Sequence, residues 1–163
     1  MKVNKRLYIP QVIIRQFSIN DFPEVRALEL DAFNEDNSMY YIELYQFFPD
    51  SFYVATVNNK VVGFVVGLIV ERVGRIFSLA VLRDYRGSGI GKALLEKIID
   101  VLEKKEVKKI RLEVRENNEV AKRLYKSMNF KEVGIIPYYY KDGGSAIVME
   151  REGLSWKNYS RNL

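Results

Sequence analysis

Three glycines within five residues constrain the fold of this chain more than any other feature. They lie in the segment RGSGIG at 86–91, which follows an apolar stretch at 75–81 and opens a run with apolar residues at helical spacing. A turn between a strand and a helix leaves backbone N–H groups unpaired at the positive end of the helix dipole, which attracts a phosphate. Glycine lets the backbone approach such an anion and adopt positive φ. The segment therefore predicts an anion site at a strand–helix junction.

Residue spacing narrows the kind of phosphate ligand. A Walker loop ending at Lys92 would require Gly where Arg86 stands and Ser or Thr where Ala93 stands. A dinucleotide fingerprint that begins at Gly87 would require Gly where Lys92 stands. Both nucleotide loops are therefore excluded.

Composition limits the chemistry that this site can use. The chain has 163 residues, 48% of them hydrophobic, which predicts a single domain with its own core. Because it has no Cys and no His, it lacks thiolate nucleophiles, His general bases and the usual zinc ligands. Catalysis must therefore use carboxylates, Tyr, Ser, Lys, backbone amides or a bound cofactor.

Charge and hydropathy patterning exclude several partners. The net charge is +5, but opposite charges are interleaved, as in KKEVKK, which favours a solvated surface over a nucleic-acid-binding stripe. The most apolar run, at 61–70, is about half as long as a membrane-spanning helix and fits a buried strand better. Residues 1–17 lack the apolar core of a signal peptide. We expect a cytoplasmic protein with no membrane and no nucleic-acid partner.

The pattern along the chain predicts an α+β fold. One domain is expected over residues 1–163, with its core at about 11–151 and, at 152–163, a tail that is loose or a short helix. Strands are expected at 12–17, 52–57, 61–70, 75–81, 108–114, 131–136 and 146–151. Helices are expected from 22, at 38–48, from 90 and from 119. Together they make one central mixed sheet of about seven strands, flanked by about four helices.

Local signals add three finer expectations. Asp21 and Glu24 have the spacing of a capping box for the first helix. A turn near Gly74 is expected to separate two strands of a meander. Asn118 is expected to be the N-cap of the last helix. The inner face of that helix is expected to carry Val120, Ala121, Leu124, Tyr125 and Met128.

Two motifs in the right order make the chain resemble a known family. The segment at 86–91 fits R/Q-x-x-G-x-G/A, the pattern of the GCN5-related N-acetyltransferase (GNAT) superfamily. LEVR at 112–115 and the residues that follow it are similar to the LEVR-x-x-N-x-x-A-x-x-LY-x-x-x-GF stretch of the RimI/Ard1-type N-terminal acetyltransferases. The matching residues after LEVR are Asn118, Ala121, Leu124, Tyr125 and Phe130. The resemblance covers about residues 75–150. It implies the GNAT fold and an enzyme that transfers acetyl from acetyl-CoA (acetyl-coenzyme A) to an amine attacking directly in a ternary complex.

The resemblance also implies how coenzyme A is held. Amides of the glycine loop, with Arg86 and Lys92, bind its diphosphate. The strand at 75–81 bonds the pantetheine arm through its backbone and separates from the next parallel strand to admit it. A bulge in that strand would aim an N–H at the thioester carbonyl. The coenzyme-binding residues so implied are Leu79, Ala80, Val81, Arg86, Gly87, Ser88, Gly89, Ile90, Gly91, Lys92, Asn118 and Tyr125. Asn118 fits a plain N-cap equally well.

Two catalytic residues follow from the same resemblance. Glu113 matches the glutamate of LEVR, and in a chain without His it would take the amine proton through water. An ordinary polar residue between Leu112 and Val114 on a strand would look the same. Tyr125 matches the tyrosine that the family places beside the coenzyme sulfur. Proton transfer from a phenol of pKa about 10 to a thiolate of pKa about 8.5 is unfavourable by roughly 2 kcal/mol of free energy. Tyr125 is therefore expected to hydrogen-bond to the leaving sulfur rather than to protonate it fully.

Amine basicity bears on the acceptor. The pKa of an α-amino group is about 7.8 and that of a lysine about 10.4, so a lysine costs roughly 3.5 kcal/mol more to neutralise. This favours the N-terminal α-amino group of a protein or peptide, such as a ribosomal or nascent protein, as the acceptor. The enzyme itself is expected to be a monomer or homodimer and to bind no metal. Acceptor contacts are implied for Phe33, Tyr40, Tyr139 and Tyr140. Aromatic packing across a hairpin would explain the last two nearly as well.

Departures from the pattern keep other functions open. Gly144 and Ser145 replace two acidic residues of the Ard1-type hairpin, and Asn129 replaces a Gly at a position compatible with left-handed backbone. Three carboxylates have two possible roles, to favour a cationic acceptor or only to lie in solvent at helix ends: Glu35, Asp36 and Glu43. One alternative is a same-fold acetyltransferase for a small amine such as a polyamine, or for protein lysines. Another is a non-catalytic acyl-CoA-binding module, against which Glu113 and Tyr125 argue.

Overall fold

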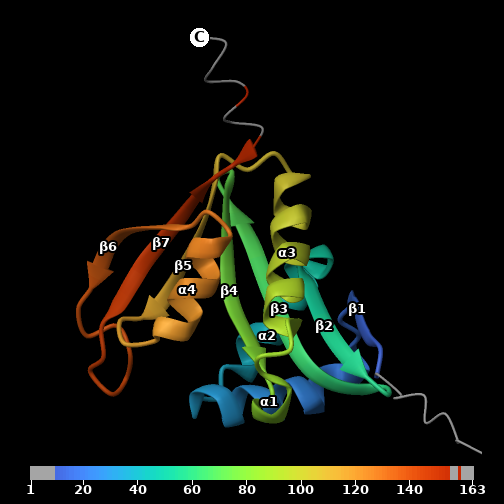
Figure 1. Ribbon diagram of the computed structural model, residues 1–163. Coiled ribbons are helices and arrows are strands. Elements are labelled where there is room, and N and C mark those ends of the chain that lie inside the picture. The colour runs from blue at the N-terminus through green and yellow to red at the C-terminus, as the bar shows by residue number, and fades with distance from the viewer. Residues whose placement is uncertain (1–9, 155–157, 159–163) are drawn as a thin grey trace, which may run out of the picture.

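The computed structural model describes residues 10–154 and residue 158. Within these residues the α+β prediction is confirmed, with a seven-stranded sheet and four α-helices (Figure 1). The strands are β1 (Val12–Gln16), β2 (Phe52–Val57), β3 (Lys60–Val70), β4 (Val73–Val81), β5 (Lys109–Arg115), β6 (Lys131–Ile136) and β7 (Ala146–Glu152). The helices are α1 (Phe22–Phe33), α2 (Ser38–Phe47), α3 (Ile90–Glu103) and α4 (Glu119–Ser127).

The sheet is mixed, in the order β1-β2-β3-β4-β5-β7-β6. Strands β1 to β4 form an antiparallel meander, β4 and β5 run parallel, and β7 lies between β5 and β6. Parallel neighbours need a crossover, and α3 supplies it between β4 and β5. The glycine segment at 86–91 therefore lies between the end of β4 and the start of α3.

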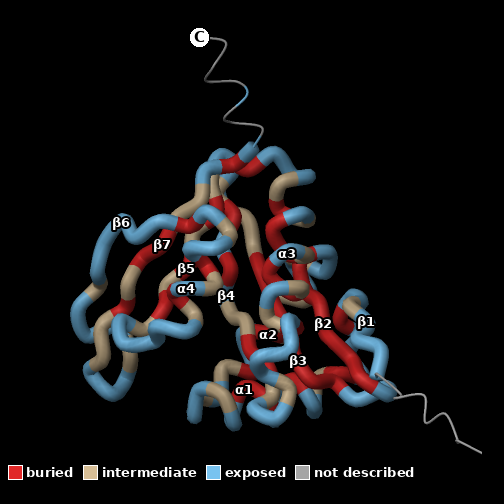
Figure 2. Tube along the Cα trace, in the orientation of Figure 1, coloured by how far each residue is buried: buried red, intermediate tan, exposed pale blue. Residues whose placement is uncertain are grey.

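Helices cover both faces of the sheet (Figure 1). On one face, α3 and α4 pack over a core that includes Leu94, Ile98 and Tyr125. On the other face, α1 and α2 bury Leu28 and Tyr41 against β2, β3 and β4. Figure 2 shows that the central strands are buried, whereas β6 at the edge of the sheet is exposed. The sheet therefore has a separate core on each face, one beneath α3 and α4 and one beneath α1 and α2.

Three glycines let α3 approach the sheet closely. Gly63, Gly67 and Gly74, which we call the glycine seam, lie on β3 and β4 beneath the inner face of α3. A Cβ at Gly67 would lie 3.1 Å from Cδ1 of Ile98 and 3.1 Å from the carbonyl oxygen of Arg75. Any larger residue there must push the helix or the strand away.

We expect Gly67→Val to lower the free energy of unfolding by about 1–3 kcal/mol, because the added methyl groups overpack the contact with α3. Urea denaturation followed by circular dichroism measures this change. Gly134→Val is the matched control, since a Cβ at Gly134 on the exposed strand β6 meets no atom within 4 Å. Equal stability of the two variants would contradict the close contact beneath α3.

Strands β4 and β5 are paired over only part of their length. The register joins Val73, Gly74 and Arg75 to residues 109–111 of β5, and both strands then continue without further pairs between them. At the point of separation β4 carries a bulge, because Val66 pairs with Ser78 whereas Gly67 pairs with Ile76, which leaves Phe77 as the extra residue. The expected separation and bulge are both present, and we call this region the β4–β5 opening.

The turn expected near Gly74 is wrong by two residues. The strands meet at Glu71 and Arg72, whose φ angles are 50° and 64°, and Val70 pairs with Val73. Both central residues of this tight hairpin turn are left-handed, a geometry usually taken by Asn or Gly, so residue type did not reveal it. Gly74 lies inside β4, where it belongs to the glycine seam.

The capping box expected at Asp21 and Glu24 is also wrong. Asp21 precedes α1, but its carboxylate accepts hydrogen bonds from the Ser18 N–H at 2.8 Å and from Arg15 at 2.7 Å. Glu24 instead accepts from the Val61 N–H at 3.1 Å. Tertiary partners have therefore replaced the local cap.

The inner face of α4 differs from the expectation at one position. Val120 is 72% exposed, whereas Tyr125 is buried at 8%. The N-cap prediction is confirmed, because Asn118 Oδ1 accepts from the Ala121 N–H at 3.1 Å. Asn129 has a φ of 67°, as its left-handed position requires.

The predictions for residues 1–9, and those for the tail after residue 154 apart from residue 158, fall outside the described residues. Within the described part, no helix has the length and apolar character needed to cross a bilayer.

Candidate active site

The glycine segment forms an open cradle at the start of α3. Gly87 and Gly89 have φ angles of 73° and 87°, and Gly89 is the N-cap of the helix. A Cβ at either glycine would meet no atom within 4 Å, so the outer side of the loop is open space. The hydroxyl of Ser88 donates to the Tyr85 carbonyl and so faces the protein. The first N–H groups of a helix have no partner within the helix, so those at the start of α3 are available to an anion that enters this loop.

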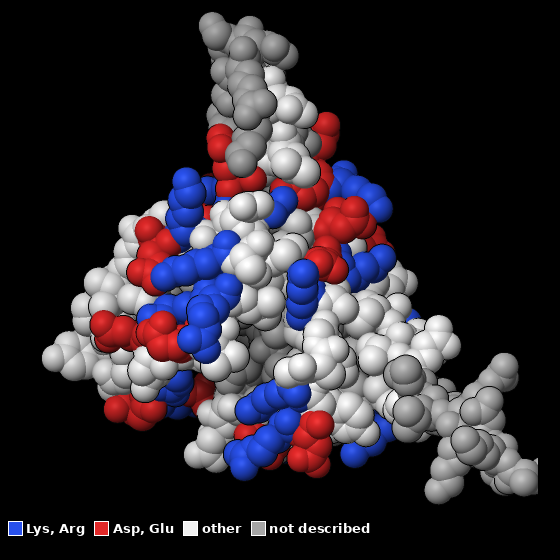
Figure 3. Space-filling view, in the orientation of Figure 1, with Lys and Arg blue, Asp and Glu red and all other residues white. Residues whose placement is uncertain are grey.

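Other predicted residues of the loop serve its geometry. The Nε of Arg86 donates to the Val81 carbonyl at 2.9 Å, which ties the loop to the end of β4. The Ile90 side chain is buried in the core, so only its backbone faces the loop. Lys92 is exposed and lies 3.9 Å from Glu96. On this face of the molecule, Lys and Arg gather over α4 and beside the start of α3, on either side of a hollow (Figure 3).

A cleft of about 930 Å³ lies along the β4–β5 opening. Its walls come from α1, α2, α4, β4, β5 and the connection between β6 and β7. It brings together these predicted residues: Phe33, Tyr40, Leu79, Glu113, Asn118, Tyr125, Tyr139 and Tyr140. The side chains of Ala80 and Val81 are buried in the two cores, which leaves only their backbone for a ligand.

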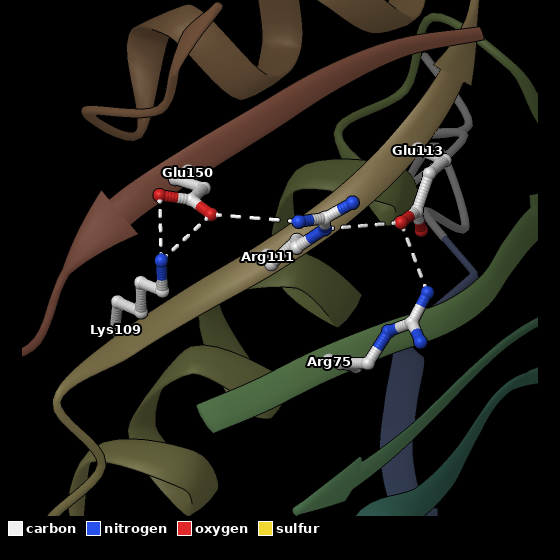
Figure 4. Close-up of polar contacts among 5 residues, drawn as sticks. All are labelled: Arg75, Lys109, Arg111, Glu113 and Glu150. Atoms are coloured by element: carbon white, nitrogen blue, oxygen red, sulfur yellow. Dashed lines mark hydrogen bonds and ion pairs between the residues drawn. The ribbon is translucent and has the colours of Figure 1, made fainter. Parts of the chain in front are cut away.

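Glu113 faces the cleft. Its neighbours Leu112 and Val114 are buried in the core beneath α3 and α4, so alternation turns Glu113 to the opposite face of the sheet. Its Oε1 accepts from Arg75 Nη2 at 2.9 Å and from Arg111 Nε at 3.2 Å (Figure 4). Glu113 is therefore a cleft carboxylate held by two arginines.

Tyr125 lies on the other side of the same cleft, on α4. It is 8% exposed and packs edge-on against Phe130, with ring centroids 5.9 Å apart. Burial raises the pKa of its phenol to about 12. The hydroxyl therefore keeps its proton at neutral pH and is available as a hydrogen-bond donor.

The acceptor side of the cleft is aromatic and charged. Tyr139 and Tyr140 stack edge to face at 5.0 Å, and the Arg115 guanidinium lies 3.9 Å from the Tyr140 ring centre. The packing role and the cleft-lining role of these tyrosines thus coexist. Asp36 does not line the cleft, because it accepts from Arg26 at 2.9 Å and from the Ser38 N–H at 3.1 Å. Of the three carboxylates considered for a cationic acceptor, Glu35 and Glu43 line the cleft and Asp36 does not.

The Acetyltransferase (GNAT) family model matches residues 22–130 of the chain, a span that includes the glycine loop, Glu113 and Tyr125.

The chain belongs to the GNAT acetyltransferase family.

Several GNAT relatives cover most of the chain. An uncharacterized N-acetyltransferase of Methanocaldococcus jannaschii is 36% identical over 140 residues, which are 85% of this chain and 90% of that protein. An N-alpha-acetyltransferase of Sulfurisphaera tokodaii is 33% identical over 152 residues, 83% of this chain and 90% of that protein. The crystal structure of Ard1 from Thermoplasma volcanium has a TM-score of 0.83 at 34% identity, and the match covers 88% of this chain and 98% of that one.

The residues present fit acetyl-CoA, the acetyl donor of GNAT enzymes. The left-handed glycines leave room over the amide cradle for a diphosphate. The separated edges of β4 and β5 leave backbone groups for an amide-bearing arm. A structure of the NatC complex bound to Gag peptide and CoA has a TM-score of 0.81 at 26% identity, covering 87% of this chain and 98% of that one.

Three residues at or next to the GNAT cleft were not predicted from the sequence. Arg75 and Arg111 are the partners of Glu113, and the alternation of β5 alone places Arg111 on the same side as Glu113. Glu29 of α1 is 1% exposed, and its Oε1 accepts from the Tyr41 hydroxyl at 2.7 Å. Burial and this carboxylate raise the pKa of Tyr41. Glu29 recurs at helical spacing after Val25, which marks a residue turned inward.

Tyr125→Phe is expected to lower kcat about tenfold while the Kd for coenzyme A stays within about twofold, because the variant loses one hydrogen bond to a charged leaving group. Steady-state kinetics and isothermal calorimetry measure the two quantities. Tyr53→Phe is the matched control, since Tyr53 is also 8% exposed but lies outside the cleft. Unchanged kcat in Tyr125→Phe would remove this phenol from the reaction.

Proposed function

We propose that this GNAT enzyme transfers acetyl from acetyl-CoA to the N-terminal α-amino group of proteins or peptides. The observation that carries the proposal is the shared cleft, in which Glu113 and Tyr125 come from opposite sides of the β4–β5 opening. A base and a hydrogen-bond donor around one gap are what amine acetylation needs in a protein without His.

The residues divide the work as follows. Acetyl-CoA supplies the acetyl group as a thioester, whose carbonyl oxygen gains negative charge during attack. The glycine loop holds the diphosphate, and the β4 backbone beside the Phe77 bulge offers an N–H toward that oxygen. Glu113 accepts the amine proton through water. Tyr125, which stays protonated, donates a hydrogen bond to the departing sulfur.

Amine basicity favours the N-terminal acceptor. The cleft holds no His, and one carboxylate must assist deprotonation, so an amine of pKa about 7.8 suits it better than a lysine of pKa about 10.4. A ribosomal-protein-S18-alanine N-acetyltransferase of Escherichia coli is 42% identical over 85 residues, which are 52% of this chain and 57% of that protein. A protein N-terminus, ribosomal or nascent, is therefore the acceptor that we propose.

A small cationic amine is the second candidate. Glu35 and Glu43 line the acceptor side of the cleft, while Gly144 and Ser145 stand where the Ard1-type pattern has acids. Carboxylates at the entrance attract a polyamine as well as a peptide ammonium.

Turnover of acetyl-CoA against four acceptors separates these functions. The acceptors are a peptide with a free N-terminus, the same peptide with a blocked N-terminus, a blocked peptide with one lysine, and spermidine. We expect turnover with the free N-terminus only. Activity confined to spermidine or lysine would overturn the proposal, and coenzyme binding without turnover of any acceptor would favour a non-catalytic module.

A further inference from the structure

Five charged side chains form a network across three strands, one end of which reaches the cleft. Arg75 of β4 pairs with Glu113 of β5 at 2.9 Å, and Arg111 lies between Glu113 and Glu150 at 3.2 Å and 3.9 Å (Figure 4). Lys109 pairs with Glu150 at 2.9 Å. Three cations thus face two carboxylates, and the network carries one excess positive charge.

Arg75 differs from the other cations of this network. It lines the cleft together with Glu113, whereas Lys109 and Arg111 do not. Its side chain is 44% exposed, while that of Glu113 is only 8% exposed. An acceptor bound at Glu113 therefore lies beside the more exposed Arg75 guanidinium.

Geometry brings the acceptor nitrogen within the field of Arg75. Arg75 Nη2 lies 2.9 Å from the Glu113 oxygen, and an amine that hydrogen-bonds to Glu113 through one water lies within about 8 Å of that guanidinium. This is no more than one Debye length at physiological ionic strength. A positive charge at such a distance disfavours an ammonium ion and favours the neutral amine, which is the form that attacks.

We propose that Arg75 is a positioning residue that selects weakly basic acceptor amines, because its charge disfavours an ammonium ion beside Glu113 while its ion pair orients the Glu113 carboxylate. The inference rests on the proposed function. An α-amino group, with a pKa of about 7.8, becomes neutral in this field at physiological pH, whereas a lysine, with a pKa of about 10.4, stays charged.

Other groups contribute to the same field. The titratable or charged side chains that face Glu113 come from β4, β5, β7, the β6–β7 connection and the α1–α2 loop: Arg75, Arg111, Glu150, Tyr139, Tyr140 and Glu35. The tyrosines are neutral near pH 7, because burial raises the pKa of both. Arg111 is shared with Glu150 and does not line the cleft, so of the two arginines that pair with Glu113 only Arg75 is directed at the cleft. Two other cations, Arg115 and Lys141, line the same cleft, as do Glu29 and Glu43.

A purely structural role for Arg75 makes a different prediction. Arg75 and Arg111 form the last register pair before the β4–β5 opening, so the Arg75–Glu113 ion pair also bridges the two strands. Loss of such a bridge would reduce activity by the same factor at every pH and for every acceptor.

The test compares the wild type with Arg75→Gln, Arg75→Lys and the control Lys109→Gln, which removes a cation from the far end of the same network. Profiles of kcat between pH 6 and 9.5 are measured with the free-N-terminus peptide, and kcat/KM is also measured with the blocked lysine peptide. In Arg75→Gln we expect the midpoint of the rising limb to move up by about 0.5–1 pH unit, since the acceptor amine then holds its proton to higher pH. Activity at pH 7 falls about three- to tenfold and recovers by pH 9.

We expect Arg75→Lys to keep most of the wild-type profile and Lys109→Gln to keep all of it. The preference for the free N-terminus over lysine is expected to shrink several-fold in Arg75→Gln alone. A pH-independent loss in Arg75→Gln, or an unchanged preference, would overturn the inference while the proposed function stands. Wild-type activity only on lysine or spermidine would overturn both. Melting temperatures of all four proteins identify any variant that has lost its fold. If Arg75→Gln has lost its fold, the pH profile and acceptor preference of Arg75→Lys decide the outcome.

Discussion

Gly89→Val is expected to weaken coenzyme A binding about 100-fold. Gly89 is the N-cap of α3 with a φ of 87°, which a β-branched residue adopts only with strain. The valine side chain would also occupy the open space over the loop, where the diphosphate must approach the amides. The loss of one or two hydrogen bonds to a charged group accounts for a change of this size.

Isothermal calorimetry with coenzyme A measures this effect directly. The control is again Gly134→Val, because Gly134 has open space around it but lies far from the loop, on edge strand β6. Circular dichroism shows whether each variant keeps its fold. Wild-type affinity in a folded Gly89→Val protein would exclude the glycine loop as the diphosphate site.

Glu113→Gln is expected to lower kcat by about 100-fold or more with little change in coenzyme affinity. The amide has nearly the same shape as the carboxylate but cannot accept a proton, and general-base catalysis contributes about 10²–10⁴-fold. The substitution also weakens the ion pairs with Arg75 and Arg111.

A second ion pair supplies the comparison for that variant. Glu132→Gln removes the carboxylate that pairs with Lys126 at 3.0 Å, outside the cleft. Because both variants lose one carboxylate and its ion pair, a difference in kcat reports the position of Glu113 rather than the loss of charge. If both variants retain wild-type kcat, Glu113 is not the base.

The part of the site that depends on local sequence could be predicted. The glycine loop combines turn, backbone freedom and helix start within six consecutive residues, so spacing alone identified it. Asn118 was likewise recognised as an N-cap because the cap lies within one helical turn of its partner.

The parts that depend on long-range pairing could not be predicted. Glu113 was found only through its motif, since alternation does not say which face of β5 meets which helices. Its partner Arg75 lies 38 positions away, and only the register of the parallel pair brings the two together. Similarly, Asp21 and Glu24 have local spacing for a cap, but Arg15 and Val61 compete for them after the sheet forms. Sequence distance, rather than residue type, separates the two groups.

The short pairing between β4 and β5 makes the sheet two half-sheets joined at one end. Three register pairs connect the four-stranded half to the three-stranded half, so the two can hinge apart more readily than a fully laddered sheet would allow. An extended donor molecule bound between them would act as an eighth strand, pairing with both inner edges and closing the hinge. Amide hydrogen exchange at the free ends of β4 and β5 should therefore slow together when the donor binds, and the enzyme would become a single rigid body only in its loaded form.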